Sequence, residues 1–472
     1  MTRVLDPTPV ADLDAHRAGG GGRGLETARN LASTDIIDLV AASGLRGRGG
    51  AGFPTGTKWE TVALYESATP TTVVVNAAEG EPGSFKDRAI LRANPFRVLE
   101  GALIAARAVD ATRVVVATKA SFTTEIARLE AAVAEITEAG WATDVAIDLV
   151  RGPSEYLFGE ETALLEVIAG RPPFPRIAPP YRRGATDVGD DPAHAAGADL
   201  ASPGGEVPPT LANNVETLAN IPGILAEGPD WFRSLGTSTS PGTVVVTITG
   251  STRRHGVAEV PMGTTLAEAI ALIGGGAREQ RDLVAALSGV ANPILAAAAF
   301  DTPLGYDELR AAGSGLGAAG FIVFDDEDDL VAVAHGVTRF LAVESCGQCR
   351  PCKQDGLESA VLLDRIRRSE GTDRDLAGLE DRLLTVTDGA RCYLAQQTQA
   401  VAGSVLQQFP DVVSAHLDGS QDAAAAHLVA PIVDLVDGVA LLDETQWEKQ
   451  PDWTHDKTDS GQPPAERYGV SA

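Results

Sequence analysis

Positive charge is in short supply in this sequence. It has 38 Lys and Arg residues against 65 Asp and Glu, which gives a formal net charge of −27. A chain this acidic repels the phosphates of nucleic acids and the headgroups of anionic membranes, which argues against both as partners. The densest acidic run, at residues 325–329, is typical of a solvated loop.

Long apolar runs are missing as well. Because no stretch of about 18 apolar residues occurs, we expect no transmembrane helix and no direct membrane insertion. Residues 1–14 are polar and lack the apolar core of a signal peptide. We therefore expect a cytoplasmic protein, which reaches the inner face of a membrane only through partner subunits.

Cysteine is also rare: the chain has four in 472 residues. Cys346, Cys349 and Cys352 stand at C-x2-C-x2-C spacing, and Cys392 follows much later. A 4Fe–4S cluster takes four thiolates, and this three-plus-one pattern supplies them. Structural zinc, which favours two C-x2-C pairs, and buried inert thiols are the alternatives.

A glycine-rich stretch at residues 44–59 follows a predicted helix at 36–42. Its glycines allow backbone N–H groups to approach a ligand closely, and Arg46, Arg48 and Lys58 add positive charge where a phosphate would lie. A helix rather than a strand before the loop argues against the ordinary dinucleotide fingerprint. A merely flexible loop is the alternative.

Alternating strands and helices come next. Strands are predicted at 72–76, 113–118 and 144–150, and helices at 96–109, 121–139 and 159–169. This alternation indicates a mainly parallel sheet covered by helices. Asn76 ends the first strand, and Glu79 and Glu81 follow it, at the place where such sheets bind ligands. The alternative is that these residues only form a solvated loop at the strand end.

Further polar residues stand at the ends of later elements. Glu160 and Glu161 begin a helix after the loop that carries Tyr156, and they either meet a ligand's donors or complement the helix dipole. Asn213 and Asn214 precede another helix as ligand contacts or caps.

The second half of the chain predicts two further units. A small α+β domain resembling a ubiquitin-like β-grasp is indicated by strands at 243–250, 257–261, 282–288 and 321–324 and a helix at 264–273. A bundle around the cysteines is indicated by helices at 330–342, 354–369, 373–386 and 392–408.

Five stretches together resemble one family: the flavin-carrying, NADH-oxidising subunit of complex I and its soluble relatives, the diaphorase subunits of NAD-linked hydrogenases and formate dehydrogenases. They are GLRGRGGAGFPTGTKW (44–59), NAAEGEPGSFKDR (76–88), EYLFGEETALLE (155–166), NNVETLANIPG (213–223) and ESCGQCRPC (344–352). They occur in the family's order and span most of the chain.

The resemblance implies a multidomain α/β fold. Its parts would be a Rossmann-like FMN- and NADH-binding domain (34–240, with an irregular excursion at 171–209), a β-grasp domain (241–328), a C-terminal helical bundle carrying the iron–sulfur cluster (329–412) and an extended tail (413–472). Before them, the glycine-rich residues 1–33, with four consecutive glycines at 19–22, indicate a flexible N-terminal arm.

The resemblance also implies site residues. FMN would contact Gly47, Arg48, Gly49, Gly50, Lys58, Asn76, Tyr156, Gly159, Glu160, Asn213 and Asn214. NAD(H) would contact Phe53, which would stack on the adenine, and Glu79, Glu81, Glu160 and Glu161. The 4Fe–4S cluster would be held by Cys346, Cys349, Cys352 and Cys392.

The implied activity is hydride transfer from NADH to FMN, followed by single-electron transfer to the cluster. Electrons would leave through partner iron–sulfur proteins, namely a thioredoxin-like 2Fe–2S subunit and a further electron-accepting subunit. The cofactors carry the redox chemistry, so no catalytic side chain is expected.

Three positions depart from the family's pattern. Ala78 stands where the family has an aspartate, Thr61 where many relatives have a second adenine-stacking aromatic residue, and Cys392 lies in an unusual local sequence. The lost acid leaves the preference between NADH and NADPH open. It also supports an alternative function, a degenerate paralogue that acts as a structural or relay subunit without oxidising NADH.

Overall fold

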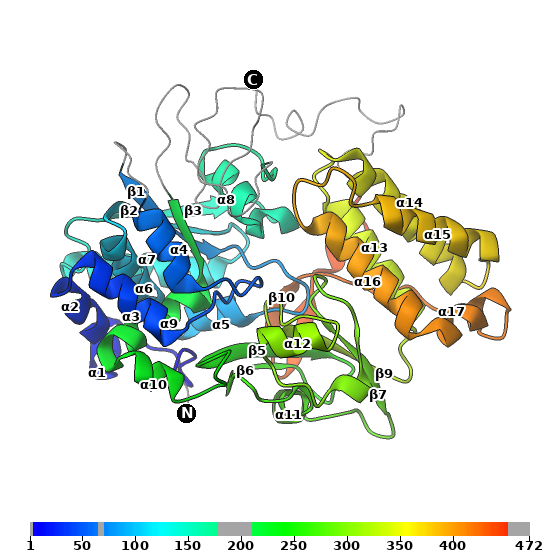
Figure 1. Ribbon diagram of the computed structural model, residues 1–472, viewed down its shortest axis with the longest axis horizontal. Coiled ribbons are helices and arrows are strands. Elements are labelled where there is room, and N and C mark those ends of the chain that lie inside the picture. The colour runs from blue at the N-terminus through cyan, green and yellow to red at the C-terminus, as the bar shows by residue number, and fades with distance from the viewer. Residues whose placement is uncertain (1–2, 65–69, 177–209, 452–472) are drawn as a thin grey trace.

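A parallel sheet forms the first half of the computed structural model, which describes residues 3–64, 70–176 and 210–451 (Figure 1). Its four strands lie in the order β3-β2-β1-β4. They are β1 (Thr71–Ala77), β2 (Ala111–Lys119), β3 (Ala146–Gly152) and β4 (Thr210–Asn214). The predicted strands of this sheet are confirmed, and β4 is an addition that the sequence reading missed.

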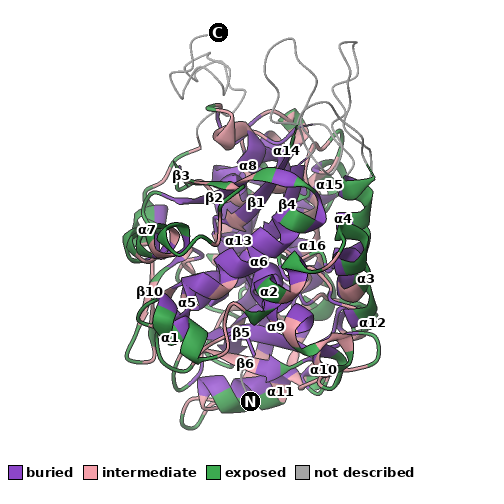
Figure 2. Cartoon of the chain, turned by 90° about the vertical axis from the view of Figure 1, so that its left-hand side faces the viewer, coloured by how far each residue is buried: buried purple, intermediate pink, exposed green. Residues whose placement is uncertain are grey.

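Helices cover both faces of this sheet. One face, with Val73 and Val75 of β1, packs in the core that contains residues of α6 (Pro95–Ala108) and α9 (Val215–Glu227). The other face, with Val74, packs against Phe158 and Leu164. The helices of this half are α3 (Ser33–Ser43), α4 (Thr55–Ala63), α5 (Lys86–Ala93), α6 (Pro95–Ala108), α7 (Thr123–Glu138), α8 (Glu161–Ile168), α9 (Val215–Glu227) and α10 (Pro229–Arg233), with the short 3-10 helix η1 (Tyr156–Gly159). Strands buried on both faces explain the nearly continuous apolar runs of β1 and β2, and Figure 2 shows them in purple.

The prediction of a flexible arm at residues 1–33 is wrong. The helices α1 (Leu13–Ala18) and α2 (Arg23–Arg29) pack on the parallel-sheet half, and Leu13 and Leu25 belong to its core. The glycines that suggested flexibility serve close packing instead. A Cβ atom on Gly24 would lie 2.5 Å from the carbonyl oxygen of Pro222 in α9, so only glycine lets α2 approach this closely.

A mixed five-stranded sheet follows, in the order β6-β5-β9-β7-β8. Its strands are β5 (Thr243–Gly250), β6 (Gly256–Pro261), β7 (Leu283–Ser288), β8 (Leu295–Ala296) and β9 (Gly320–Asp325). Its helical segments are α11 (Leu266–Ala269), the π turn η2 (Ile270–Gly274), the 3-10 turn η3 (Ala297–Ala299) and α12 (Tyr306–Ala311). The four predicted strands are confirmed, and β5 pairs in parallel with β9 while the other pairs are antiparallel.

Five helices form a bundle that lies away from the parallel sheet (Figure 1). They are α13 (Leu330–Glu344), α14 (Arg350–Arg367), α15 (Asp373–Thr385), α16 (Leu394–Gln408) and α17 (Pro410–Leu417). The helix predicted at 354–369 begins earlier, because Pro351 occupies the first turn of α14, where it needs no hydrogen-bonded N–H. The predicted boundary at residue 412 falls inside α17.

The acidic run at 325–329 is a solvated loop only in its middle, where Asp326 and Glu327 are exposed. Asp325 is fully buried and pairs with Arg278 at 2.6 Å, and Asp329 caps α13 by accepting from the N–H of Ala332.

The prediction of an extended tail at 413–472 is wrong for the part of this segment that the structure describes. After α17 the chain forms a hairpin of β10 (Ile432–Val436) and β11 (Val439–Leu442) and then the 3-10 turn η4 (Glu444–Trp447). Residues 452–472, like most of the predicted excursion at 171–209, lie outside the described residues. Among the helices that are described, none has both the length and the apolar character needed to cross a membrane.

Candidate functional site

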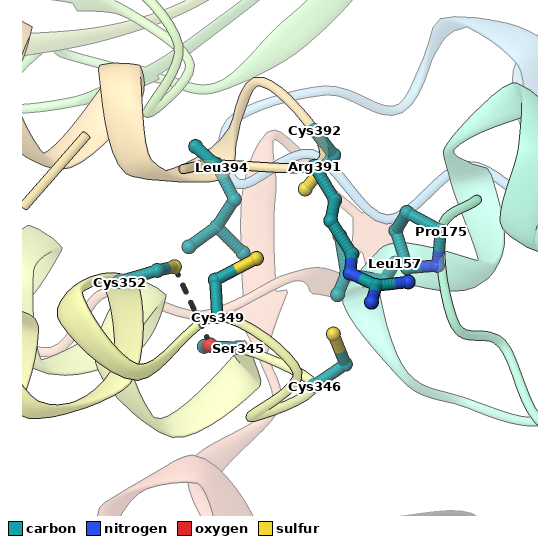
Figure 3. A pocket seen from close by; sticks show the side chains of 10 residues that line it. Leu157, Pro175, Ser345, Cys346, Cys349, Cys352, Arg391, Cys392 and Leu394 are labelled. Carbon is teal, nitrogen blue, oxygen red and sulfur yellow. Dashed lines mark hydrogen bonds between the residues drawn. The ribbon is translucent and has the colours of Figure 1, made fainter. Parts of the chain in front are cut away.

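Four thiols line one pocket in the bundle (Figure 3). Cys346 and Cys349 come from the loop between α13 and α14, Cys352 from the first turn of α14, and Cys392 from the segment before α16. Figure 3 shows all four sulfur atoms turned toward the space between them. The structure therefore brings together the four cysteines that the spacing grouped.

Most side chains around the thiols are apolar, but the charged side chain of Arg391 also lines the pocket. Leu157, Pro175 and Leu394 line the same pocket. Two neutral polar groups contact the sulfurs. Ser345 Oγ lies 3.5 Å from Cys352 Sγ, and the side-chain amide of Gln348 donates to Cys346 Sγ at 3.3 Å.

Burial raises the pKa of three thiols in this pocket. The pKa of Cys352 rises to about 11, and those of Cys346 and Cys392 also rise, in each case chiefly through desolvation. These three thiols are therefore protonated at neutral pH until a metal centre displaces the protons.

The spacing of the sulfurs distinguishes kinds of metal site. A single zinc ion with four thiolates at about 2.3 Å requires the sulfurs to lie within roughly 4 Å of one another. Within the described residues, no three His, Cys, Asp or Glu side chains converge closely enough to hold one metal ion. The preference for an iron–sulfur cluster over zinc rests on the three-plus-one pattern of the cysteines, since structural zinc favours two C-x2-C pairs.

The second group of candidate residues lies at the carboxyl edge of the parallel sheet. Asn76 near the end of β1 pairs in register with Asn214 at the end of β4. The side-chain amide of Asn76 donates to the carbonyl of Gly159 at 2.9 Å, and Asn213 accepts from the indole N–H of Trp59 at 2.8 Å. Residues far apart in the sequence thus meet where parallel sheets bind ligands.

The cationic side chains of the glycine-rich stretch have different partners. The Arg48 guanidinium is buried and donates to the carbonyl oxygens of Pro241 and Thr243, so its charge is not available to a phosphate, contrary to our expectation. Arg46 pairs with Asp307 at 3.1 Å.

Lys58 is therefore the cation of the stretch that stays at the sheet edge. Its Nζ atom lies 2.9 and 3.0 Å from the two carboxylate oxygens of Glu161, at the start of α8. The pair joins a residue predicted to bind FMN to one predicted to bind NAD(H), and both side chains are partly exposed.

Two of the predicted carboxylates have structural roles. Glu160 is the N-cap of α8 and accepts from the N–H of Ala163 at 2.8 Å, which confirms the helix-end alternative for this residue. Glu79 accepts from Ser84 and from the first N–H groups of α5. Desolvation raises the pKa of both carboxyl groups.

A hydrogen-bonded chain links the sheet edge to the bundle. The Tyr156 hydroxyl donates to Glu81 at 2.6 Å and accepts from the amide of Gln397 in α16 at 2.8 Å, while the backbone N–H of Val290 donates to the other oxygen of Glu81 at 2.7 Å. Burial raises the pKa of Tyr156 well above its ordinary value and also raises that of Glu81. Tyr156 therefore connects the two candidate regions.

Sequence reasoning missed several residues of this region. Gln397 belongs to a plain polar run after Cys392, and Lys119 ends a strand whose predicted limit was 118. Lys86 is buried beneath the edge and contacts Asp87 at 2.7 Å and Glu216 at 2.9 Å. The position of Lys119 at a strand end was the available signal, while the others depend on contacts across the fold.

Models of three protein families match this chain. Residues 40–223 match the Nuo51 FMN-binding domain, residues 245–285 match the SLBB domain, and residues 332–416 match the NADH-ubiquinone oxidoreductase-F iron-sulfur binding region.

Curated relatives match nearly the whole chain. The F 2 subunit of the NADH-quinone oxidoreductase of Rhizobium meliloti (strain 1021) is 36% identical over 429 residues, covering 89% of this chain and 97% of the relative. The HndC subunit of the NADP-reducing hydrogenase of Solidesulfovibrio fructosivorans is 36% identical over 423 residues, covering 88% and 82%. Among solved structures, an NAD+-reducing NiFe-hydrogenase in the H2-reduced state matches with a TM-score of 0.74 and 30% identity, over 88% of this chain and 66% of that longer chain.

Proposed function

Because this chain belongs to the family of the NADH-quinone oxidoreductase F subunits, we propose that it is the NADH-oxidising subunit of a complex I-like or NAD-linked hydrogenase assembly. It is an FMN-dependent oxidoreductase that uses FMN, a 4Fe–4S cluster and NAD(H). When bound, FMN accepts the electron pair of a hydride and the cluster carries single electrons, so together they convert two-electron into one-electron transfer.

We assign the cluster to Cys346, Cys349, Cys352 and Cys392. The observation that carries this assignment is the single pocket that all four thiols line. Leu157, Pro175 and Leu394 make much of its wall apolar, Ser345 and Gln348 add neutral hydrogen bonds to the sulfurs, and Arg391 supplies one positive charge among the lining side chains.

We assign FMN to the carboxyl edge of the parallel sheet. Lys58 supplies the positive charge for the phosphate once the pair with Glu161 opens, and the backbones of Gly49 and Gly50 approach the phosphate without Cβ atoms in the way. The N–H groups of Gly47 and Arg48 already donate to Phe53 and Thr217. The polar groups that hold the remaining edge of the flavin are those of Asn76, Tyr156, Gly159, Asn213 and Asn214.

We assign NAD(H) to the face of the same loop that carries Phe53. This aromatic side chain is 52% exposed, which is unusual for a large apolar residue and leaves a ring free to stack on adenine. Glu81 and Glu161 offer carboxylate acceptors to the nucleotide, while Glu79 and Glu160 keep their neighbouring helix ends in place.

The finer architecture follows the same assignment. The parallel-sheet half is the Rossmann-like domain for FMN and NADH, the five-stranded sheet is the β-grasp domain, and the helical bundle carries the cluster. We place the protein in the cytoplasm. Its partners are a thioredoxin-like 2Fe–2S subunit and a further electron-accepting subunit, because single electrons that leave the cluster require one-electron acceptors.

A second candidate is a relay subunit that has lost NADH oxidation. Ala78 favours it, since this side chain is buried and packs with Val74 and Phe158 where the family pattern has an acid. Anaerobic purification with iron and flavin counts, followed by NADH titration of the visible flavin band, decides between the two. About four irons and one FMN per chain, with bleaching by NADH, support the proposed function. Iron with a flavin that ignores NADH supports the relay.

A further inference from the structure

The last described segment, residues 421–451, runs across all three parts of the molecule, and we call it the C-terminal strap. On the parallel-sheet half, Arg88 of α5 donates to the carbonyl oxygens of Ile432 and Val433 at 3.0 and 2.7 Å. On the five-stranded sheet, the backbone N–H of His255 donates to Gly438 at 2.6 Å.

The strap is also fastened to the bundle. Arg339 of α13 donates to the carbonyl oxygens of Gln446, Trp447 and Lys449 at 2.9 to 3.1 Å. These three bonds fix the backbone from which the Lys449 side chain extends.

Lys449 contacts Glu344, the residue before Ser345 of the pocket lining. Its Nζ atom lies 2.6 Å from one carboxylate oxygen of Glu344, and the other oxygen of Glu344 accepts from the backbone N–H of Tyr156 at 3.0 Å. Glu344 is the last residue of α13 and stands two residues before Cys346; its side chain is only 4% exposed. One carboxylate thus holds the strap, the cluster loop and the Tyr156 loop together.

A buried carboxylate at this position needs a cation. Besides Lys449, the cations in this neighbourhood include Lys119 at the end of β2 and the buried Lys353 of α14, whose Nζ atom donates to the carbonyl oxygens of Ala342 and Val343. Burial lowers the pKa of Lys119 to about 8, while Glu344 raises it and Lys449 lowers it, which places the three charges in one neighbourhood.

We propose that Lys449 is a positioning residue for electron transfer: it neutralises Glu344 beside the cysteine pocket and holds that carboxylate against the Tyr156 backbone. The inference rests on the proposed function, because its effect is exerted on the cluster. An uncompensated negative charge near a cluster opposes the addition of an electron, so loss of Lys449 lowers the reduction potential and loss of Glu344 raises it.

The test is a redox titration of the cluster followed by electron paramagnetic resonance at neutral pH, without NADH. We expect Lys449→Met to lower and Glu344→Gln to raise the ratio of reduced to oxidised cluster at a fixed potential, each by roughly tenfold. The double variant returns to the wild-type value, and Lys449→Arg retains it. Glu448→Gln is the matched control, because it removes a charge from the exposed neighbouring residue and leaves the potential unchanged.

Shifts in the same direction for Lys449→Met and Glu344→Gln, or no shift in either, would overturn the proposal. A second measurement is independent of cluster loading: in urea unfolding of the metal-free chain, Lys449→Met must be less stable than the double variant, because only the single variant buries an unpaired carboxylate. Equal stability of these two variants also contradicts the pairing. A wild-type chain that takes up no cluster refutes the proposed function, while the urea comparison still decides whether the pair exists.

Discussion

The cysteine pocket and the carboxyl edge of the parallel sheet differ in how their ionisable groups are paired. In the pocket, buried thiols of raised pKa face one another and receive hydrogen bonds from neutral groups. At the sheet edge, charged side chains are already paired, as Lys58 is with Glu161. The pocket therefore depends on a metal centre to ionise its ligands, whereas the edge is satisfied on its own and a ligand must compete with the protein's internal pairs.

The largest expected effect is loss of the metal centre. Cys349→Ser removes one of four thiolates, so we expect the paramagnetic cluster signal to disappear while FMN stays bound. Iron analysis and flavin counts on the same sample measure this. Tyr393→Phe, which alters an exposed ring next to Cys392, is the control and retains full iron. An unchanged signal in Cys349→Ser would show that the four thiols do not share one cluster.

At the sheet edge the matching experiment removes the cation. Lys58→Met should weaken FMN binding by about 10- to 100-fold, since charge-assisted hydrogen bonds contribute about 1.5–3 kcal/mol. Glu161→Gln leaves Lys58 without its carboxylate competitor, so we expect FMN to bind at least as tightly as in the wild type. Flavin fluorescence titration of the flavin-free proteins measures both. Wild-type affinity in Lys58→Met would place the phosphate elsewhere.

Lys119 departs from the pairing that is general at the sheet edge. Its Nζ atom donates to the carbonyl of Ser154 at 2.9 Å, and burial lowers its pKa to about 8 from 10.5. Between these values the unfolded chain binds the extra proton, so stability rises with pH across this window, by about 3 kcal/mol in total. Lys119→Met should remove that rise and stabilise the protein below pH 8. Urea unfolding at several pH values measures it, and equal slopes in both proteins would contradict the buried charge.

His335 gives a comparable effect inside the bundle, in the acid range of pH. Burial lowers its pKa to about 4 from 6.5, although Asp364 lies 3.7 Å away. As the pH falls from about 6.5 to 4, the unfolded chain takes up the proton first, so stability falls by about 3 kcal/mol. His335→Gln should flatten this acid limb in urea unfolding. A variant that follows the wild-type curve would mean that the imidazole is already charged in the folded protein.

The sequence predicts those features that depend on short spacing or on regular alternation. The three close cysteines and the strands around Val73–Val75 and Val114–Val116 are of this kind, because ligand spacing and apolar runs are local signals. The role of Arg48 could not be predicted in this way. Its charge seemed free to bind a phosphate in the sequence, but in the fold it donates to the carbonyl oxygens of Thr243 in β5 and of Pro241 before it.

Composition misled most where small residues pack tightly. The glycines before residue 33 suggested flexibility, yet Gly24 marks a close contact between helices that only the three-dimensional structure reveals. The links Lys58–Glu161, Tyr156–Gln397 and Lys449–Glu344 join residues more than a hundred positions apart, so no local pattern contains them.

The central claim is that electrons from NADH reach a cluster held by the four cysteines. The most direct measurement is electron paramagnetic resonance of the anaerobic, cofactor-loaded protein before and after addition of NADH. We predict that NADH bleaches the flavin and that the signal of a reduced 4Fe–4S cluster appears in the wild type, whereas Cys349→Ser shows the bleaching alone. A wild-type protein with full iron and flavin that shows neither change with NADH would contradict the account.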